Sequence, residues 1–156
     1  MTTVTKITQI LVHAPLESAF EYVSDLSRHP EWNGGLKIEA VTPGPIAVDK
    51  EYISHGVVTV QKDRPNTVRV SQYEPPHKYG FIADDPDFGE ASHVFTFDKQ
   101  NGNVLVTRTM TLVLNPIVAF FFSNFIYPLI GGPSMRKSMS ALKVKLEEKA
   151  ALASWS

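Results

Sequence analysis

The first third of the chain combines an alternating stretch with two short helical patterns. Residues 1–10 alternate polar and apolar side chains, which is typical of a strand with one buried face. Pro15 fits the first turn of a helix, because its missing N–H has no intrahelical partner there. The apolar positions of that helix recur at helical spacing at Leu16, Phe20 and Val23. After a break, Asp25 or Ser27 can cap a second short helix that ends near Trp32. Helices this short are not stable alone, so we expect both to pack on a larger surface.

Between residues 36 and 114 the apolar positions recur with a period of two, which predicts strands. The alternating runs cover residues 36–40, 51–61, 67–74, 79–83, 92–98 and 104–114. Turn-forming residues separate them: Pro43-Gly44-Pro45, Asp63-Arg64-Pro65-Asn66, Pro75-Pro76, the acidic loop Asp84-Asp85-Pro86-Asp87 and Gln100-Asn101-Gly102-Asn103. Asn101-Gly102 in particular is typical of a hairpin. Together with the first strand, the short connections predict about seven strands in an antiparallel meander.

After Pro116 the pattern becomes helical. Gly131-Gly132-Pro133 should interrupt the helix once, and Ser134 can cap the part that follows. In that part, Met135, Met139, Leu142 and Leu146 recur at three- and four-residue spacing among charged residues. We therefore expect an amphipathic helix of about four turns with one apolar face against the sheet. Residues 150–156 should form a fraying tail.

One apolar segment is long enough to raise the question of a membrane. Residues 112–130 carry no charge and include three consecutive phenylalanines at 120–122. A membrane span needs roughly 20 continuous apolar residues, whereas Pro116 and Pro128 interrupt this segment and its first residues belong to a strand. We therefore expect a strand end and then an apolar helix buried in the domain or in a homodimer interface. Contact of residues 117–130 with a membrane surface is the open alternative.

Composition narrows the class of protein. At 156 residues the chain has the size of one domain, which we take to span residues 1–156. The formal charge is −1 and both signs are mixed along the chain, so we expect no basic face that binds nucleic acid. The chain has no cysteine, which excludes disulfides, thiolate catalysis and zinc–thiolate sites. The alternating N-terminal residues do not resemble a signal peptide, so we expect a cytoplasmic protein.

The order of these elements, together with five short motifs, resembles a known superfamily. The motifs are Val12-x-Ala14-Pro15, Phe20-x-x-Val23-x-Asp25, Pro30-x-Trp32, Glu74-x-Pro76 and Asn101-Gly102. They are similar to the polyketide cyclase/dehydrase and lipid-transport superfamily, also called START-like, SRPBCC or birch-pollen-allergen-like, and the similarity covers residues 4–150. The resemblance implies an α+β helix-grip fold. In this fold a curved seven-stranded antiparallel sheet wraps around a long C-terminal helix, two short helices lie between strands 1 and 2, and an apolar cavity separates sheet from helix.

One charged residue of the last predicted strand falls on the face expected to line this cavity. Val104, Val106, Arg108, Met110, Leu112 and Leu114 share that face, and a threonine-rich face lies opposite. A guanidinium is costly to bury without a partner, so two interpretations of Arg108 stay open. It can hold a carboxylate, phosphate or enolate oxygen of a ligand, or it can pair with an acidic side chain or reach water from the strand end.

His93 is the second candidate, because it shares a face with Phe95 and Phe97 in the strand before it. An imidazole inside the cavity can act as a general acid or base, and a satisfied core histidine is the alternative. The remaining candidates for ligand contact are Tyr52, Tyr73, Phe81, Phe95, Met110, Met135 and Met139. The two tyrosines can also be plain packing residues at sheet edges. No histidine or carboxylate spacing suits a metal ion, and no phosphate-binding or dinucleotide motif occurs, so we expect neither a metal nor a cofactor.

These features lead to three hypotheses for function. The leading one is a binding module whose cavity takes a hydrophobic or amphipathic small molecule such as a lipid, a polyketide or an aromatic metabolite. The alternative is a cyclase or dehydratase, in which the same cavity orients a polyketone and His93 or Arg108 assists enolisation. The third is an accessory protein that contacts a membrane or a partner through residues 117–130.

Overall fold

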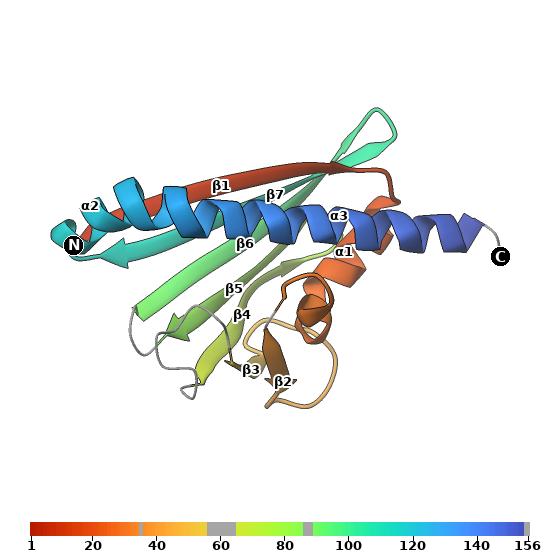
Figure 1. Ribbon diagram of the computed structural model, residues 1–156. Coiled ribbons are helices and arrows are strands. Elements are labelled where there is room, and N and C mark those ends of the chain that lie inside the picture. Colours follow the sequence, from red (N-terminus) through yellow and green to blue (C-terminus); the bar gives the residue numbers. More distant parts are fainter. Residues whose placement is uncertain (35, 56–64, 86–88, 155–156) are drawn as a thin grey trace.

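The computed structural model describes residues 1–34, 36–55, 65–85 and 89–154. Its strands are β1 (Thr2–Val12), β2 (Lys37–Ala40), β3 (Glu51–His55), β4 (Asn66–Glu74), β5 (Lys78–Asp85), β6 (Gly89–Gln100) and β7 (Asn103–Leu114). Its helices are α1 (Leu16–Ser24), the 3₁₀ helix η1 (Leu26–Glu31), α2 (Pro116–Phe121), the π-helix η2 (Phe122–Gly131) and α3 (Gly132–Ser154). Figure 1 shows the last three as one rod across a face of the sheet.

The strands described form one antiparallel sheet in the order β1-β7-β6-β5-β4-β3-β2. Strands β2 to β7 follow one another as a meander, and β1 pairs with β7. The predicted α+β helix-grip fold is therefore confirmed, with α1 and η1 between β1 and β2. The predicted hairpin joins β6 to β7, where Asn101 and Gly102 adopt φ values of 48° and 83°. This left-handed pair is the conformation that Asn-Gly favours in a two-residue turn.

Some strand boundaries differ from expectation. β3 covers the first five residues of the predicted run 51–61, and the rest lies outside the described residues, as do residues 63 and 64 of the predicted turn 63–66. Asp84 was expected to begin an acidic loop and instead extends β5, because it pairs with Glu90 of β6. Residues 86 and 87 of that loop lie outside the described residues.

The face of β7 that was predicted to point inward does so. Val104, Val106, Arg108, Leu112 and Leu114 are buried and Met110 is partly buried. In the antiparallel register Arg108 lies opposite Phe95, and Met110 lies opposite His93. Phe81 of β5 continues this row on the other side of His93. These side chains therefore share the inner face of the sheet.

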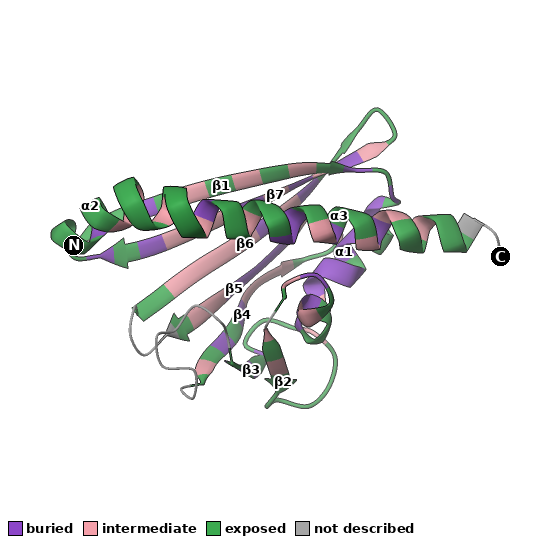
Figure 2. Ribbon diagram, in the orientation of Figure 1, coloured by how far each residue is buried: buried purple, intermediate pink, exposed green. Residues whose placement is uncertain are grey.

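The hydrophobic core lies between the sheet, α1 and α3. Leu16, Phe20 and Val23 of α1 are buried, as their spacing predicted, and so are Met139, Leu142 and Leu146 of α3. The Phe20 ring meets the edge of Phe97 on the sheet, with 5.3 Å between ring centroids. Figure 2 shows that burial is concentrated toward α1, whereas the part of the long helix that begins with α2 is mostly exposed.

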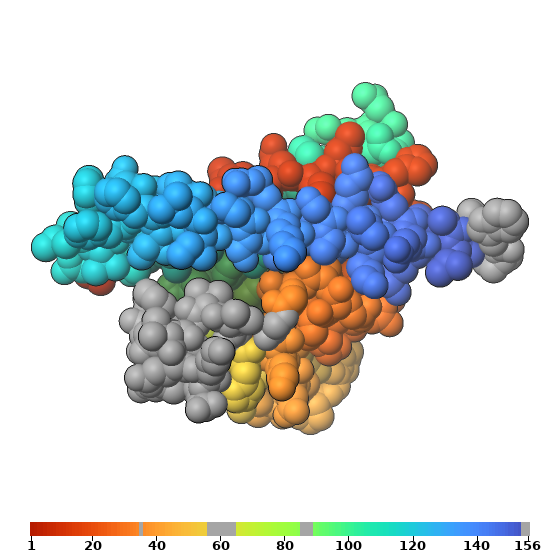
Figure 3. Space-filling view, viewed as in Figure 1, coloured from red at the N-terminus to blue at the C-terminus, as the bar shows by residue number. Residues whose placement is uncertain are grey.

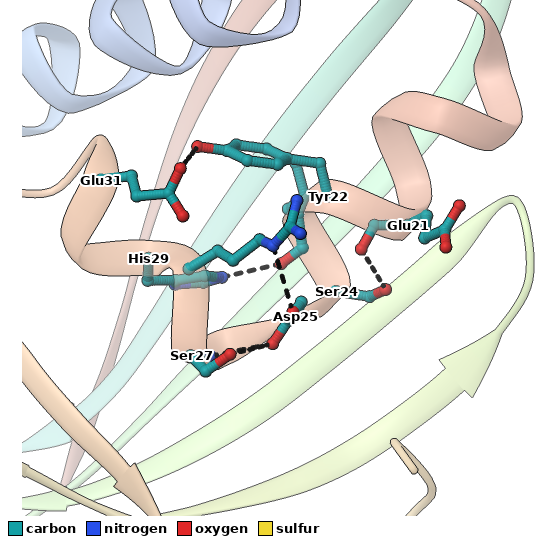
Figure 4. Close-up of polar contacts among 9 residues, drawn as sticks. Glu21, Tyr22, Ser24, Asp25, Ser27, His29 and Glu31 are labelled. Carbon is teal, nitrogen blue, oxygen red and sulfur yellow. Dashed lines mark hydrogen bonds and ion pairs between the residues drawn. The ribbon is translucent and has the colours of Figure 1, made fainter. Parts of the chain in front are cut away.

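Asp25 joins the two short helices, as the sequence predicted. Its carboxylate accepts hydrogen bonds from the backbone N–H of Ser27, at 3.1 Å, and from the Ser27 hydroxyl. Arg28 Nε lies 3.5 Å from the same carboxylate. Figure 4 shows Asp25 and Ser27 facing each other at the corner between α1 and η1. Asp25 is therefore the N-cap of η1.

Asp25→Ala should lower the free energy of unfolding by about 1 kcal/mol, because a lost N-cap typically costs about 0.5–2 kcal/mol. Asp25→Asn is the matched control, since asparagine keeps a cap acceptor and loses only the charge. We expect it to cost less than half as much. Urea denaturation followed by circular dichroism measures both values. Equal losses in the two variants would assign the effect to the charge of Asp25 and contradict the capping role.

The predicted break at Gly131-Gly132-Pro133 is wrong. α2, η2 and α3 follow one another without an interruption, so the chain is helical from Pro116 to Ser154. Ser134 is therefore not a helix cap, and residues 150–154 are helical rather than a fraying tail.

The π-helical winding of η2 explains why the helix continues. In a π-helix the backbone N–H bonds to the carbonyl five residues earlier, as the Gly132 N–H does to the Tyr127 carbonyl. Pro128 lies inside this segment. Its missing N–H and its ring would disturb the hydrogen-bond ladder of an ordinary α-helix. The wider turn accommodates the proline, and the helix axis passes on into α3.

Candidate functional site

A cluster centred on Arg108 occupies the middle of the inner face. Arg108 is only 7% exposed, and its Nε and Nη2 are 3.3 and 3.2 Å from His93 Nδ1. The ion pairs among the described residues, Arg28 with Asp25 and Arg69 with Asp49, lie elsewhere. Arg108 is thus a buried cation whose polar neighbour in the described part of the chain is a histidine rather than an acid.

Burial makes this cluster an unfavourable place for positive charge. It lowers the pKa of Arg108 well below its ordinary value, to about 10, so the guanidinium is still charged at neutral pH. Burial, together with the charge of Arg108 and with His29, holds the pKa of His93 well below its ordinary value. His93 is therefore neutral at pH 7. Because its Nδ1 accepts from Arg108, its proton is on Nε2.

Trp32, which follows η1, adds an indole to the cluster. The guanidinium carbon of Arg108 lies 6.0 Å from the Trp32 ring and 5.2 Å from the Phe95 ring, within the range in which a cation is attracted to an aromatic face. Among the described residues, Trp32 Nε1 is buried and has no hydrogen-bond partner. An indole N–H can only donate. The cluster therefore presents a donor, the Trp32 N–H, for which the described residues offer no acceptor.

His29 packs against the Trp32 indole. Its ring is 4.6 Å from the Trp32 ring, and its Nε2 donates to the Val23 carbonyl at 2.7 Å. In Figure 4 the His29 ring points from η1 back toward α1. Burial lowers the pKa of His29 to about 4, and the charge of Arg108 adds to the shift. The sequence pattern did not place Trp32 or His29 at the site, although the motif Pro30-x-Trp32 was the available signal.

The inner face is accessible on one side of the cluster. Ala83, Ala91 and Met110, which lie on or next to the row that contains His93, are partly exposed. Met135 of α3 and Tyr127 of η2 are also partly exposed. Figure 2 shows this partly exposed stretch of the sheet, and in Figure 3 green atoms of the sheet are set back beneath the blue helix. The Arg108 cluster thus lies where the packed core meets an accessible apolar surface.

A family model described as polyketide cyclase/dehydrase and lipid transport matches residues 1–147. The chain belongs to this family. This match confirms the superfamily that the five motifs resembled. No curated protein matched the sequence at a significant level.

Solved structures with the fold of this family match nearly the whole chain. TTHA0849 from Thermus thermophilus is 16% identical with a TM-score of 0.67, and the match covers 97% of this chain and 99% of that one. Ara h 8.0201 is 11% identical with a TM-score of 0.66, covering 93% and 98% of the two chains. The di-domain ARO/CYC StfQ from the steffimycin biosynthetic pathway is 10% identical with a TM-score of 0.73, covering 96% of this chain and 52% of StfQ. At these identities the likeness shows the fold and not a shared activity.

The expected cavity of this family lies between sheet and C-terminal helix, whereas a cavity of about 810 Å³ in this chain lies beside α1. Its walls come from α1, η1, β2, β3, β4 and the connections around them, and no lining residue belongs to α3. Tyr52 and Tyr73 line it. So does Lys50, whose Nζ donates a hydrogen bond to the Gly44 carbonyl. This cavity is in a different place from the one that the resemblance implied.

The predicted site residues fall into four groups. Phe81, Phe95 and Arg108, which are buried, come together with the partly exposed His93, whereas Met110 opposite His93 and Met135 on α3 are partly exposed. Tyr52 and Tyr73 line the cavity beside α1, and Met139 is buried in the core. Ligand binding by these residues stays a prediction. Within the described ranges, no group of three or more histidine, aspartate or glutamate residues could hold a metal ion.

Proposed function

We propose that the protein binds an amphipathic small molecule, whose carboxylate, enolate or similar oxygen contacts Arg108 and whose hydrocarbon part lies on the accessible half of the inner face. The observation that carries the proposal is the buried guanidinium, which has no carboxylate partner among the described residues. The effective cost of burying an uncompensated charge is several kcal/mol. An anionic ligand group would supply the missing partner.

The neighbours of Arg108 support a ligand oxygen at this position. Trp32 Nε1 is an unpaired donor, and neutral His93 carries its proton on Nε2. The planar guanidinium can form two parallel bonds to a carboxylate. Phe81 and Phe95 border the cluster and keep the local dielectric low, which strengthens a charge-assisted hydrogen bond. The description of the family includes lipid transport, which is consistent with a ligand that is largely apolar.

The same donors would stabilise an enolate, which is what a cyclase or dehydratase requires. Such an enzyme also needs a base that removes a proton. In the present geometry His93 Nδ1 already accepts from Arg108, and no carboxylate of the described residues belongs to the cluster. Binding therefore accounts for the described residues more completely than a reaction does, and we place the enzyme hypothesis second.

A matched pair of fluorescent probes tests the proposal. 1-Anilinonaphthalene-8-sulfonate and N-phenyl-1-naphthylamine share an aromatic body, and only the former carries an anion. At pH 7 we expect the sulfonate to bind at least about tenfold more tightly, since hydrogen bonds to charged groups contribute about 1.5–3 kcal/mol. Fluorescence titration measures both affinities.

The cavity beside α1 provides the control for this titration. Lys50→Met removes the cation of that cavity and should leave the preference for the sulfonate unchanged. Circular dichroism on each sample verifies the folded state, because partly unfolded proteins also bind the sulfonate probe. Equal affinity for the two probes, or loss of the preference in Lys50→Met, would contradict an anion site at Arg108.

A further inference from the structure

The segments α2 and η2 present a broad apolar surface, which we call the apolar helix surface. Its members are between 43% and 74% exposed: Ile117, Val118, Phe120, Phe121, Phe125, Ile126, Leu129 and Ile130. The helix from Pro116 to Ala153 contains an 18-residue window with a mean hydropathy of 1.3, of which 11% is buried. By length and composition this helix could cross a membrane. The expectation that the segment is buried within the domain is therefore wrong, whereas burial in a homodimer interface stays a prediction.

The winding of η2 separates this segment into two stripes with four-residue spacing. Ala119, Ser123, Tyr127 and Gly131 form the inner stripe, which is buried or partly buried. Ile117, Phe121, Phe125 and Leu129 form the outer stripe, which is exposed. Further apolar side chains flank the outer stripe on both sides. A flat protein partner can cover one side of such a rod, whereas lipid can surround all of its exposed sides.

Contacts with the sheet favour a helix that lies along a membrane rather than one that crosses it. Ala119 packs with Val4, Leu112 and Leu114 in a small cluster at this end of the sheet. Lys6 Nζ lies 4.9 Å above the Tyr127 ring. A crossing helix would have to leave these contacts. An interfacial helix keeps them and buries its outer stripe, together with the apolar side chains that flank this stripe, in the lipid.

Basic residues border the apolar helix surface. Lys6 of β1 lies against Tyr127 of the inner stripe, and the exposed Arg136 and Lys137 follow the apolar helix surface on α3. From residue 109 to residue 135 the chain carries no charge, and no acidic residue occurs on the helix before Glu147. Helices that lie in the interface of an anionic membrane commonly have cations next to an exposed apolar segment, because the cations attract the lipid headgroups.

We infer that the apolar helix surface docks the protein on an anionic lipid membrane, with the outer stripe inserted between the headgroups. This inference goes beyond the proposed ligand function and does not depend on it. The apolar helix surface and the proposed ligand site are adjacent in space. Tyr127 belongs to η2, which carries much of that surface, and it is close enough to Arg108 to interact with its charge. A docked molecule would therefore hold its ligand site close to the lipid.

Vesicle flotation tests the inference. Purified wild-type protein should float with vesicles made of equal amounts of phosphatidylcholine and phosphatidylglycerol, and added salt should weaken the association. Phe121→Glu places a charge in the outer stripe and should reduce the bound fraction roughly tenfold or more. Leu152→Glu is the matched control, since it puts the same charge on a 72% exposed leucine near the far end of the same helix. Its binding should equal that of the wild type.

Two further measurements make every outcome decisive. If circular dichroism shows that Phe121→Glu unfolds, Phe125→Trp replaces it, and brominated lipids in the vesicles should quench the added indole. Arg108→Met should bind vesicles as the wild type does, which separates docking from ligand binding. The inference is overturned by absence of wild-type flotation, by equal losses in Phe121→Glu and Leu152→Glu, or by a lipid-free dimer that Phe121→Glu dissociates, because a second copy would then cover the surface.

Discussion

Replacing Arg108 by methionine should raise the free energy of unfolding and remove the preference for an anionic ligand. Burial lowers the pKa of Arg108 well below its ordinary value, to about 10. Because one pKa unit is about 1.4 kcal/mol, the site disfavours the charged form by about 3 kcal/mol. Methionine has a similar length and no charge, and it would pack against Phe95 and Trp32. Allowing for the lost cation–aromatic contacts, we expect the variant to be more stable by about 2 kcal/mol.

Urea unfolding at pH 7 measures this stability, and titration with the two naphthalene probes measures the binding. Arg69→Met is the matched control, because Arg69 pairs with Asp49 at 3.2 Å on an exposed part of the sheet. An exposed ion pair contributes about 0–1 kcal/mol, so this variant should show little change and keep the probe preference. A destabilised Arg108→Met variant that still prefers the sulfonate would identify Arg108 as a structural residue.

The expected gain in stability bears on why an arginine occupies this position. The inner face of β7 is otherwise apolar at Val104, Val106, Leu112 and Leu114. A further apolar side chain at position 108 would complete that pattern without a charge to bury. Natural proteins keep such costly residues mainly where function requires them. The same reasoning applies to the unpaired Trp32 Nε1, since a buried donor without an acceptor also costs stability.

The alternation along β7 shows what the sequence could predict. Side chains on a strand point alternately to its two faces, so the burial of Leu112 and Leu114 places Arg108 on the same inner face. Asn101-Gly102 defines the turn and thereby the register with β6, which brings Arg108 opposite Phe95. The alternation of side chains and the hairpin turn were sufficient to place Arg108, because a strand repeats the same geometry over several residues.

Other features depend on contacts that no local pattern encodes. His29 and Trp32 reach the cluster because η1 packs against Phe81 and Phe95, which are far away in sequence. The continuity of the long helix depends on the wide winding of η2, whereas Gly131-Gly132-Pro133 by itself is typical of a break. The position of the cavity beside α1 depends on side chains from several connections. Spacing along the chain carries no information on such packing.

Acidification should destabilise the folded protein through His29. Burial lowers the pKa of this imidazole to about 4 in the folded state, from the ordinary value of 6.5 that it regains in the unfolded chain. Above pH 6.5 both states are neutral, so His29 has no effect on stability there. Between pH 6.5 and 4 the unfolded chain takes up a proton that the folded chain does not, which favours unfolding. The shift corresponds to a loss of about 3 kcal/mol once the pH has fallen to 4. His93, whose pKa is also lowered, acts in the same direction.

His29→Gln isolates this effect, because the glutamine amide can donate to the Val23 carbonyl in place of Nε2 and does not titrate. Its free energy of unfolding should fall less steeply than that of the wild type as the pH is lowered from 7 to 4. Urea denaturation at several pH values measures the difference, in which carboxylate titrations common to both proteins cancel. His55→Gln removes an exposed imidazole and should follow the wild-type curve. Parallel curves for His29→Gln and the wild type would show that His29 does not stay neutral in the folded protein at low pH.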